Sequence, residues 1–206
     1  MTTPPPGGER YVVWQATKVA RDQRTHQGAS LWLTGLSGSG KSSLGIELER
    51  LLVAAGRPAY LMDGDNLRHG LNSDLGFSDD DRRENIRRTA EVAALFADSG
   101  AVAIISLISP FIEERRRARE IHEERGLAFY EIFLDTPLAE CEHRDPKGLY
   151  ARARRGQIRR FTGIDSPYER PEDPDIAVTP ADGMPTDAAR HVLETLGLAD
   201  RQGDTR

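Results

Sequence analysis

The sequence predicts a single α/β domain in which a central parallel sheet is flanked by helices. The run LWLTGLSGSGKSSL at 31–44 places a short apolar strand, a glycine-rich loop and a helix start in direct succession. Further apolar strands then alternate with helical segments, which is typical of a parallel sheet built from strand-helix-strand units. The length of 206 residues suits one such domain with a buried core.

Residues 35–42 match the phosphate-binding pattern G-x-x-x-x-G-K-[ST]. The pattern is carried by Gly35, Gly40, Lys41 and Ser42. Glycines let backbone N–H groups turn toward a polyphosphate, and the helix that begins near Lys41 adds the positive end of its dipole. Lys41 could then reach the β/γ-phosphates and Ser42 could ligate Mg²⁺. The chain has three lysines among 28 basic residues, so an accidental lysine in a glycine-rich turn is the weaker reading.

Composition narrows the class of protein. The net charge of −5 argues against a general nucleic-acid binder or a protein of the membrane surface. No apolar run approaches the length of a membrane span, and 1–10 lacks the hydrophobic core of a signal peptide. The single Cys141 allows no internal disulfide and fits a core position in a reducing compartment. We therefore expect a cytoplasmic protein.

The helix after the loop is expected to end near Ala55, before Gly56-Arg57-Pro58, and residues 59–62 then form a second strand. This strand delivers Asp63 and Asp65 to the carboxyl end of the sheet, where open α/β folds bind ligands. Two acids there suit Mg²⁺ binding or proton acceptance from an attacking hydroxyl, with Asp63 nearest the strand. An Asp-Gly turn that merely caps the strand explains these residues equally well.

The stretch 67–85 interleaves arginines with an aromatic residue. Arg68, Arg82 and Arg83 could fork onto phosphate or sulfate oxygens, and the ring of Phe77 could stack on a base. Ser78 and Asp81 form a capping pair that opens a helix ending at Ser99-Gly100. In the alternative interpretation the arginines are simply the solvated side of this helix. Its inner face is predicted to comprise Ile86, Ala90, Ala93 and Ala97.

The next strand, 101–107, leads to Ser109 and Pro110. A serine before proline suits the N-cap of a helix with proline at its first position, so Ser109 has a structural interpretation beside a functional one. The segment 113–125 alternates charges and is predicted to be a solvated helix. Residues 129–134 and 175–178 are predicted strands, and 186–196 is a closing helix.

The segment 144–160 carries seven basic residues and one acid in an acidic protein. A mobile lid that closes over phosphates has this composition, and so does a solvated helix in an arginine-rich chain. Lys147 is the residue that favours the lid, because lysine is scarce elsewhere. We divide the chain into an N-terminal tail and packing arm at 1–27, one domain at 28–200 with its lid at about 144–160, and a C-terminal tail at 201–206.

Several long motifs resemble those of the adenylylsulfate kinases (APS kinases) in the family's order. Besides GLSGSGKS they are DGDNLRHGLNSDLGFSDDDRRENIRR at 63–88, ISP at 108–110, DPKGLY at 145–150 and FTGID at 161–165. The resemblance implies a P-loop kinase fold, Mg²⁺, and transfer of the ATP γ-phosphoryl group to the 3′-hydroxyl of adenosine 5′-phosphosulfate. It also implies a homodimer and, as a possible partner, an ATP sulfurylase, which is fused to this kinase in some organisms.

The resemblance also implies roles for individual residues. Lys41, Asp63 and Ser109 would be catalytic, with Ser42 and Asp63 at the metal. Some relatives have been described as forming a phosphoserine at the position of Ser109, but we favour direct in-line transfer with Ser109 in the substrate site. ATP would be held by Gly35, Leu36, Ser37, Gly38, Ser39, Gly40, Lys41, Ser42, Ser43 and Arg144, with Arg144 near the adenine. The phosphosulfate substrate would contact Asp65, Arg68, Phe77, Arg82, Asn85, Ile108, Ser109, Lys147 and Phe161.

One position departs from the family pattern. Many relatives have an arginine after the aromatic residue that follows Ser-Pro, whereas here Phe111 is followed by Ile112. Arg115 and Arg116 are the nearby cations that could compensate. Two other functions stay open from the sequence, namely a P-loop kinase for another small molecule and a non-catalytic nucleotide-binding subunit. The aromatic and arginine residues argue against the first, and intact Lys41, Ser42 and Asp63 argue against the second.

Overall fold

The computed structural model describes residues 13, 15 and 18–199. It contains a five-stranded parallel sheet with the order β2-β3-β1-β4-β5. The strands are β1 (Ala29–Thr34), β2 (Ala59–Asp63), β3 (Val102–Ser106), β4 (Ala128–Leu134) and β5 (Ile176–Val178). The predicted α/β class and the predicted strands are confirmed. Of the tail and packing arm expected at 1–27, only residues 13, 15 and 18–27 are described, and the tail expected at 201–206 lies outside the described residues.

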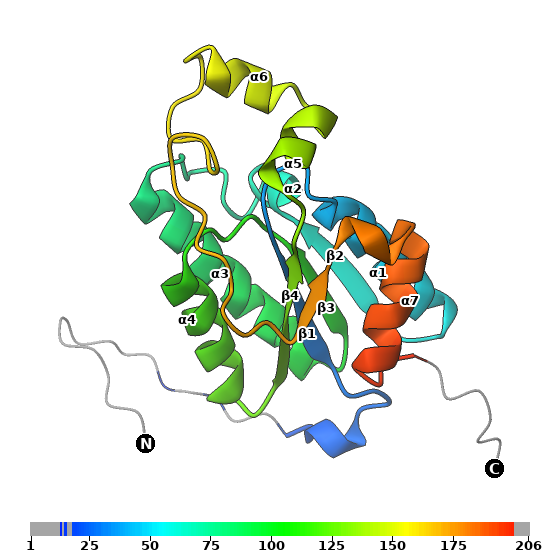
Figure 1. Cartoon of the computed structure of the whole chain (residues 1–206). Helices are drawn as coiled ribbons and strands as arrows, with labels where there is room; N and C mark the ends of the chain where they lie inside the picture. The colour runs from blue at the N-terminus through cyan, green and yellow to red at the C-terminus, as the bar shows by residue number, and fades with distance from the viewer. Residues whose placement is uncertain (1–12, 14, 16–17, 200–206) are drawn as a thin grey trace.

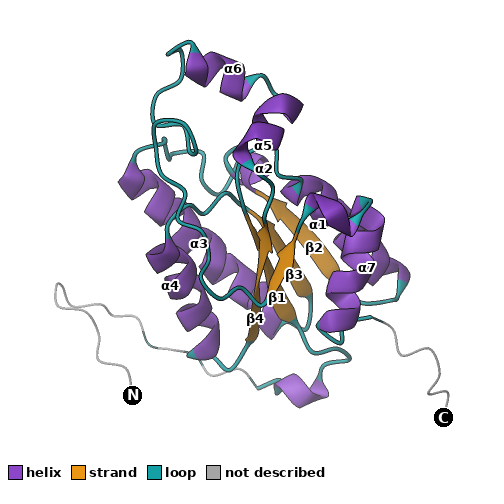
Figure 2. Ribbon diagram, in the orientation of Figure 1, coloured by secondary structure: helices purple, strands orange, loops and turns teal. Residues whose placement is uncertain are grey.

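Helices cover both faces of the sheet (Figures 1 and 2). The helices α1 (Lys41–Ala54) and α7 (Pro185–Thr195) lie on one face, and α3 (Asp79–Asp98) and α4 (Ile112–Glu123) lie on the other. Short helices complete the chain: η1 (Arg21–Gln23), α2 (Gly64–Leu67), α5 (Leu138–Arg144), α6 (Leu149–Arg154) and η2 (Pro180–Asp182). No helix in the described part of the chain is both long and apolar enough to cross a bilayer.

The alternation of side chains along β1 separates two hydrophobic cores. Leu31 and Leu33 pack toward α1 and α7, whereas Trp32 packs with the alanine-rich face of α3. All six residues of β1 are buried, as expected for the central strand of a sheet covered on both faces. The predicted inner face of α3 is confirmed, because Ile86, Ala90, Ala93 and Ala97 are all buried.

The strand register brings the functional segments to one edge of the sheet. Ser106 pairs with Asp63 on one side and with Leu33 on the other, so the carboxyl ends of β2, β3 and β1 lie level. Figure 1 shows α5 and α6 rising above this edge, with the chain returning from them across the front of α3 and α4. The phosphate loop, Asp63 and the basic segment therefore meet at the carboxyl edge.

Candidate active site

The glycine-rich loop between β1 and α1 adopts the conformation that its sequence predicts. Gly35, Gly38 and Gly40 have φ values of 148°, 75° and 104°, a region that other residues rarely adopt. The side chain of Lys41 lies within the loop, where Nζ donates to the carbonyl oxygens of Gly35 at 2.9 Å and Leu36 at 2.7 Å. Burial lowers the pKa of Lys41 to about 8, because the ammonium loses its hydration there.

Ser42 and Asp63 form a hydrogen-bonded pair between the loop and the end of β2. Ser42 Oγ donates to Asp63 Oδ2 at 2.6 Å, and Asp63 Oδ1 accepts from the backbone N–H of Asp65 at 3.0 Å. The sequence left open whether Asp63 caps the strand end or binds a ligand, and the structure allows both. One carboxylate oxygen caps α2, and the other accepts from Ser42 at the phosphate loop. A hydroxyl beside a carboxylate is an oxygen pair suited to Mg²⁺.

This pair fits the way Mg²⁺ binds in phosphoryl-transfer sites. In the described part of the chain, no three His, Cys, Asp or Glu side chains cluster as a metal cage. Mg²⁺ usually takes only one or two protein ligands and completes its octahedron with water and substrate phosphates. Ser42 and Asp63 supply that partial set at the mouth of the phosphate loop.

A cavity of about 720 Å³ runs from the phosphate loop to the arginines of the next segment. It joins residues from six separate stretches of the chain. Most of the predicted site residues line it. They are Ser37, Gly38, Gly40, Lys41, Ser42, Ser43, Asp63, Asp65, Arg68, Phe77, Arg82, Asn85, Ile108, Ser109, Arg144, Lys147 and Phe161.

The far end of the cavity combines cationic and aromatic side chains. The guanidinium of Arg68 lies 4.3 Å from the centroid of the Phe77 ring. Arg82 Nη1 donates to Thr162 Oγ1 at 3.0 Å, which ties α3 to the segment that carries Phe161. Lys147 forms an ion pair with Asp65 from the opposite wall. This end of the cavity can therefore hold an anionic group next to a flat ring.

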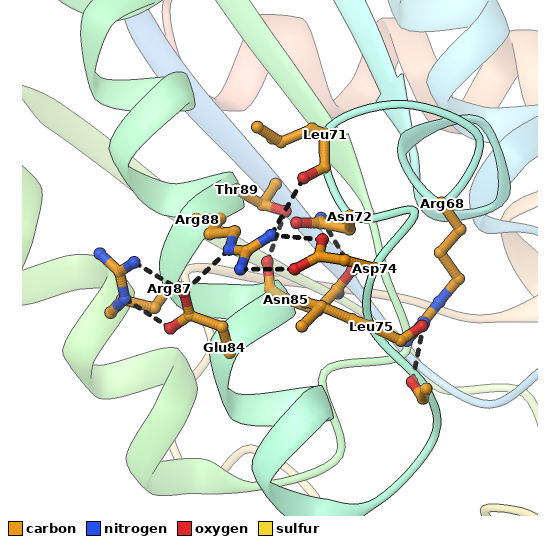
Figure 3. Close-up of polar contacts among 11 residues, drawn as sticks. Arg68, Leu71, Asn72, Asp74, Leu75, Glu84, Asn85, Arg87, Arg88 and Thr89 are labelled. Atoms are coloured by element: carbon orange, nitrogen blue, oxygen red, sulfur yellow. Dashed lines mark hydrogen bonds and ion pairs between the residues drawn. The ribbon is translucent and has the colours of Figure 1, made fainter.

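The amide of Asn85 is oriented by a buried neighbour (Figure 3). Asn72 is fully buried, and its Nδ2 donates to Asn85 Oδ1 at 2.9 Å. This bond occupies the carbonyl oxygen of Asn85, so its NH₂ group remains to donate into the cavity. A donor at this position suits the oxygens of a phosphate or sulfate.

Ser109 is held by the sheet and does not begin a helix. The expectation that Ser109 is an N-cap followed by proline at the first helical position is wrong, because α4 begins at Ile112 with Phe111 as its N-cap. Ser109 has a φ of 40°, and its Oγ accepts from Trp32 Nε1 at 3.1 Å and donates to Thr34 Oγ1 at 3.0 Å. These two partners lie on β1, so the hydroxyl is bonded to the sheet, and Ser109 is also one of the residues that line the cavity.

A few predicted residues lie apart from the cavity wall. Gly35, Leu36 and Ser39 are not among the lining residues, although the first two accept hydrogen bonds from Lys41. Arg83, suggested as an anion ligand, points away from it and pairs with Glu114 at 2.9 Å. Arg82 and Arg83 are adjacent on a helix and therefore face different sides. The pattern of charges in the sequence does not show which of the two arginines faces the cavity.

Arg115 has a role that the sequence analysis missed. The segment 113–125 was predicted to be a solvated face, yet Arg115 is 3% exposed. It pairs with Glu131 at 2.6 Å, and its Nη1 donates to the carbonyl oxygen of Ser109 at 2.7 Å. Neither it nor Arg116 lines the cavity, and Ile112 does not line it either. Arg115 instead supports the Ser109 backbone.

Comparison with known proteins gives consistent matches. The family described as adenylylsulphate kinase matches residues 27–179. The adenylyl-sulfate kinase of Clostridium acetobutylicum is 57% identical over 171 residues, covering 81% of this chain and 84% of that relative. The bifunctional enzyme CysN/CysC of Mycobacterium tuberculosis is 51% identical over 194 residues, or 94% of this chain, and the chain spans 31% of its length.

A solved structure shares the fold. The Mycobacterium tuberculosis APS kinase CysC in complex with AMPPNP and APS matches with a TM-score of 0.81 at 54% identity. The match covers 84% of this chain and 99% of that one. The cavity described above therefore belongs to a fold in which a relative has been solved with both of these ligands.

Replacing Ser109 by alanine is expected to lower the free energy of unfolding by about 1–3 kcal/mol, because Trp32 Nε1 and Thr34 Oγ1 lose a buried partner. Chemical denaturation of Ser109→Ala measures this loss. Ser73→Ala, at an exposed serine, is the matched control and should leave stability unchanged. Equal stability of the two variants would contradict the buried placement of the Ser109 hydroxyl.

Proposed function

The chain belongs to the adenylylsulphate kinase family, and we propose that it transfers the γ-phosphoryl group of ATP to the 3′-hydroxyl of adenosine 5′-phosphosulfate. The products are 3′-phosphoadenosine 5′-phosphosulfate and ADP. The observation that carries this proposal is the single cavity that joins the phosphate loop to an arginine and phenylalanine subsite. The phosphate loop at one end suits a phosphoryl donor, and the arginine and phenylalanine subsite at the other end suits an aromatic, anionic acceptor.

Phosphoryl transfer requires mainly positioning and stabilisation of negative charge. The phosphate loop and the N-terminus of α1 supply N–H donors for the ATP phosphates, and Lys41 supplies a positive charge. Lys41 Nζ is already bonded to two loop carbonyls, so binding of phosphates exchanges these bonds for stronger charge-assisted ones. Arg144, at the end of α5, lies beside Gly38 and is proposed to contact the adenine of ATP.

Ser42 and Asp63 would hold Mg²⁺ beside the transferred group. When bound, the ion neutralises phosphate charge and aligns the donor. Asp63 also lies at the end of β2 nearest the acceptor subsite, where its carboxylate can accept the proton of the attacking 3′-hydroxyl. The acceptor itself is proposed to lie between Phe77 and Phe161, with Arg68, Arg82 and Asn85 around its anionic groups.

The geometry of Ser109 favours direct transfer over a phosphoserine intermediate. Its hydroxyl proton is donated to Thr34, and its oxygen accepts from Trp32 on the protein side. A nucleophilic serine needs its oxygen aimed at the phosphorus and an adjacent base. We propose that Ser109 shapes the acceptor subsite, together with Ile108, and forms no covalent bond.

The proposal includes a lid at about 144–160, which closes over both substrates. Two contacts support it. Lys147 on this segment pairs with Asp65 across the cavity, and Tyr150 Oη donates to the carbonyl oxygen of Ser37 at 2.9 Å. Because the ion pair is more than half exposed, it can break and re-form as ligands enter. We also propose a cytoplasmic location, where ATP is supplied and a lone Cys141 stays reduced.

The reaction is tested by measuring ADP release from ATP and Mg²⁺ with adenosine 5′-phosphosulfate, gluconate, shikimate or AMP as acceptor. We expect ADP only with the phosphosulfate, together with its 3′-phosphorylated product identified by mass. Lys41→Ala should remove most turnover, because it deletes a charge on the transferring group. Phosphorylation of gluconate or shikimate instead would make the chain a kinase for another acceptor.

ATP binding should take up protons above pH 8. Lys41 has a pKa of about 8, so it is mostly neutral at pH 8.5, and adjacent phosphates raise its pKa by favouring the charged form. Calorimetric titration of AMPPNP at pH 8.5, in two buffers of different ionisation heat, should give an uptake of up to about 0.8 proton per site. Lys41→Arg, which stays protonated, should show no such uptake, and a wild type without uptake would refute the lowered pKa.

We further propose a homodimer, formed through the apolar surface beside the edge strand β2. Tyr60 is 56% exposed, and its ring centroid lies 5.7 Å from that of Phe96 in a tilted arrangement. Leu95, which precedes Phe96 on α3, is 63% exposed. Light scattering should give twice the chain mass for the wild type and a lower mass for Leu95→Glu. A monomeric wild type would contradict this proposal. The bifunctional relatives extend beyond the matched region, which supports association with a second enzyme, proposed to be an ATP sulfurylase.

A further inference from the structure

The segment 68–77 carries two walls of the acceptor subsite but has no helix or strand of its own. It connects the end of α2 at Leu67 to the N-cap of α3 at Ser78. Arg68 and Phe77 stand at its two ends, and Phe77 is 65% exposed, so packing holds its ring only weakly. The position of the subsite therefore depends on polar contacts that fasten this segment to the body of the protein.

Arg88 on α3 provides one of these fastenings (Figure 3). Its Nη1 donates to Asp74 Oδ1 at 2.7 Å and its Nη2 donates to Asp74 Oδ2 at 3.0 Å, so the two residues form a bidentate ion pair. Nη1 also donates to the carbonyl oxygen of Leu71 at 3.2 Å. One guanidinium thus holds both a side chain and the backbone of the segment. Paired bonds of this kind fix geometry more strictly than a single ion pair.

The guanidinium of Arg88 is itself held in place from behind. Nε donates to Glu84 Oε1 at 2.8 Å, one helical turn earlier on α3. The Arg88 side chain is 28% exposed, so less solvent competes with its bonds than at an exposed surface pair. Hydrogen bonds from Arg88 hold the pKa of Asp74 below its usual range, because they favour the charged carboxylate.

The same face of α3 provides a second fastening. Asn85 lies three residues before Arg88, so both side chains project toward the segment. The side-chain Oδ1 of Asn85 accepts from the buried Asn72, and Thr89 Oγ1 donates to the backbone carbonyl oxygen of Asn85 at 2.7 Å. Asn72 and Asp74 are therefore both bonded to α3, in the middle of a segment whose two ends form the cavity wall.

We infer that Arg88 is a positioning residue for the acceptor subsite, which it shapes by holding 71–74 on α3 without lining the cavity itself. The inference rests on the proposed function for the identity of the ligand. Arg68 Nη1 donates to the carbonyl oxygens of Leu75 at 3.2 Å and Gly76 at 2.9 Å, which keeps the two ends of the turn together. Release of Arg88 would therefore free the turn as a unit, so the cation and the ring would no longer be held at one position relative to α3. The ATP end of the cavity comes from other segments and would be unaffected.

The adjacent arginine offers a matched control. Arg87 also pairs with Glu84, through bonds of 2.7 and 2.8 Å, but within the described chain its hydrogen bonds go to Glu84 and not to 68–77. Arg87→Met and Arg88→Met remove the same charge from neighbouring positions of one helix. Only Arg88→Met removes the hydrogen bonds to Leu71 and Asp74 in the segment 68–77.

Hydrogen exchange of the ligand-free protein tests the fastening directly. We expect amides of 69–76 to exchange at least fivefold faster in Arg88→Met than in the wild type, with Arg87→Met unchanged. Steady-state kinetics then tests the function. Arg88→Met should raise the KM for adenosine 5′-phosphosulfate about tenfold and leave the KM for ATP within twofold. Asp74→Asn, a mild change at a side chain that is 61% exposed, should shift both readouts in the same direction by a smaller factor.

Three results would overturn the inference. One is unchanged exchange at 69–76 in both Arg88→Met and Asp74→Asn. Another is an equal rise of both KM values, and the third is the same effect from Arg87→Met. If Arg88→Met does not fold, Asp74→Asn alone decides in the same way. If the wild type does not phosphorylate adenosine 5′-phosphosulfate at all, the proposed function fails, while the exchange experiment still reports on the fastening.

Discussion

The level pairing of β2, β3 and β1 is the constraint on which the site depends. Ser106 lies between Asp63 and Leu33 in the register, so the loop after β1 and the acid after β2 reach the same height. Only then can Ser42 and Asp63 approach to 2.6 Å from positions 21 residues apart. A slip of one residue would turn the side chain of Asp63 to the other face of the sheet and separate this pair.

Helix α3 has separate roles on its different sides. Its alanine-rich side packs on Trp32 and β3, and the small side chains let the helix lie close to the sheet. The adjoining side presents Arg82 and Asn85 to the cavity. Because the hydrophobic side is tightly packed, the polar side of the helix is also held in a fixed position. Asn85 is therefore fixed by its helix, and Asn72 orients its amide.

Local sequence signals predicted the elements and the phosphate loop well, since strand patterns, glycines and the Ser78 cap act over a few residues. The position of Asp63 at the carboxyl edge of the sheet was also predicted from local sequence, because this residue directly follows a predicted strand. The N-cap interpretation of Ser109, one of the two that its sequence allowed, is wrong, and its partners Thr34 and Trp32 lie 75 and 77 residues away. The burial of Arg115 likewise depends on Glu131 and on backbone that only the fold brings near. Long-range hydrogen bonds of this kind leave no periodic pattern in the sequence.

The scarcity of lysine has a chemical consequence. Two of the three lysines, Lys41 and Lys147, line the cavity, and apart from Lys18 the other basic residues counted among the 28 are arginines. Acylation acts on the amine of lysine and leaves guanidinium groups intact. Lys147, whose side chain is 56% exposed, offers such a reagent an open target, whereas Lys41 is enclosed by the phosphate loop. Covalent modification of surface amines would therefore mark the lid of this protein and the exposed Lys18, while leaving its many arginines untouched.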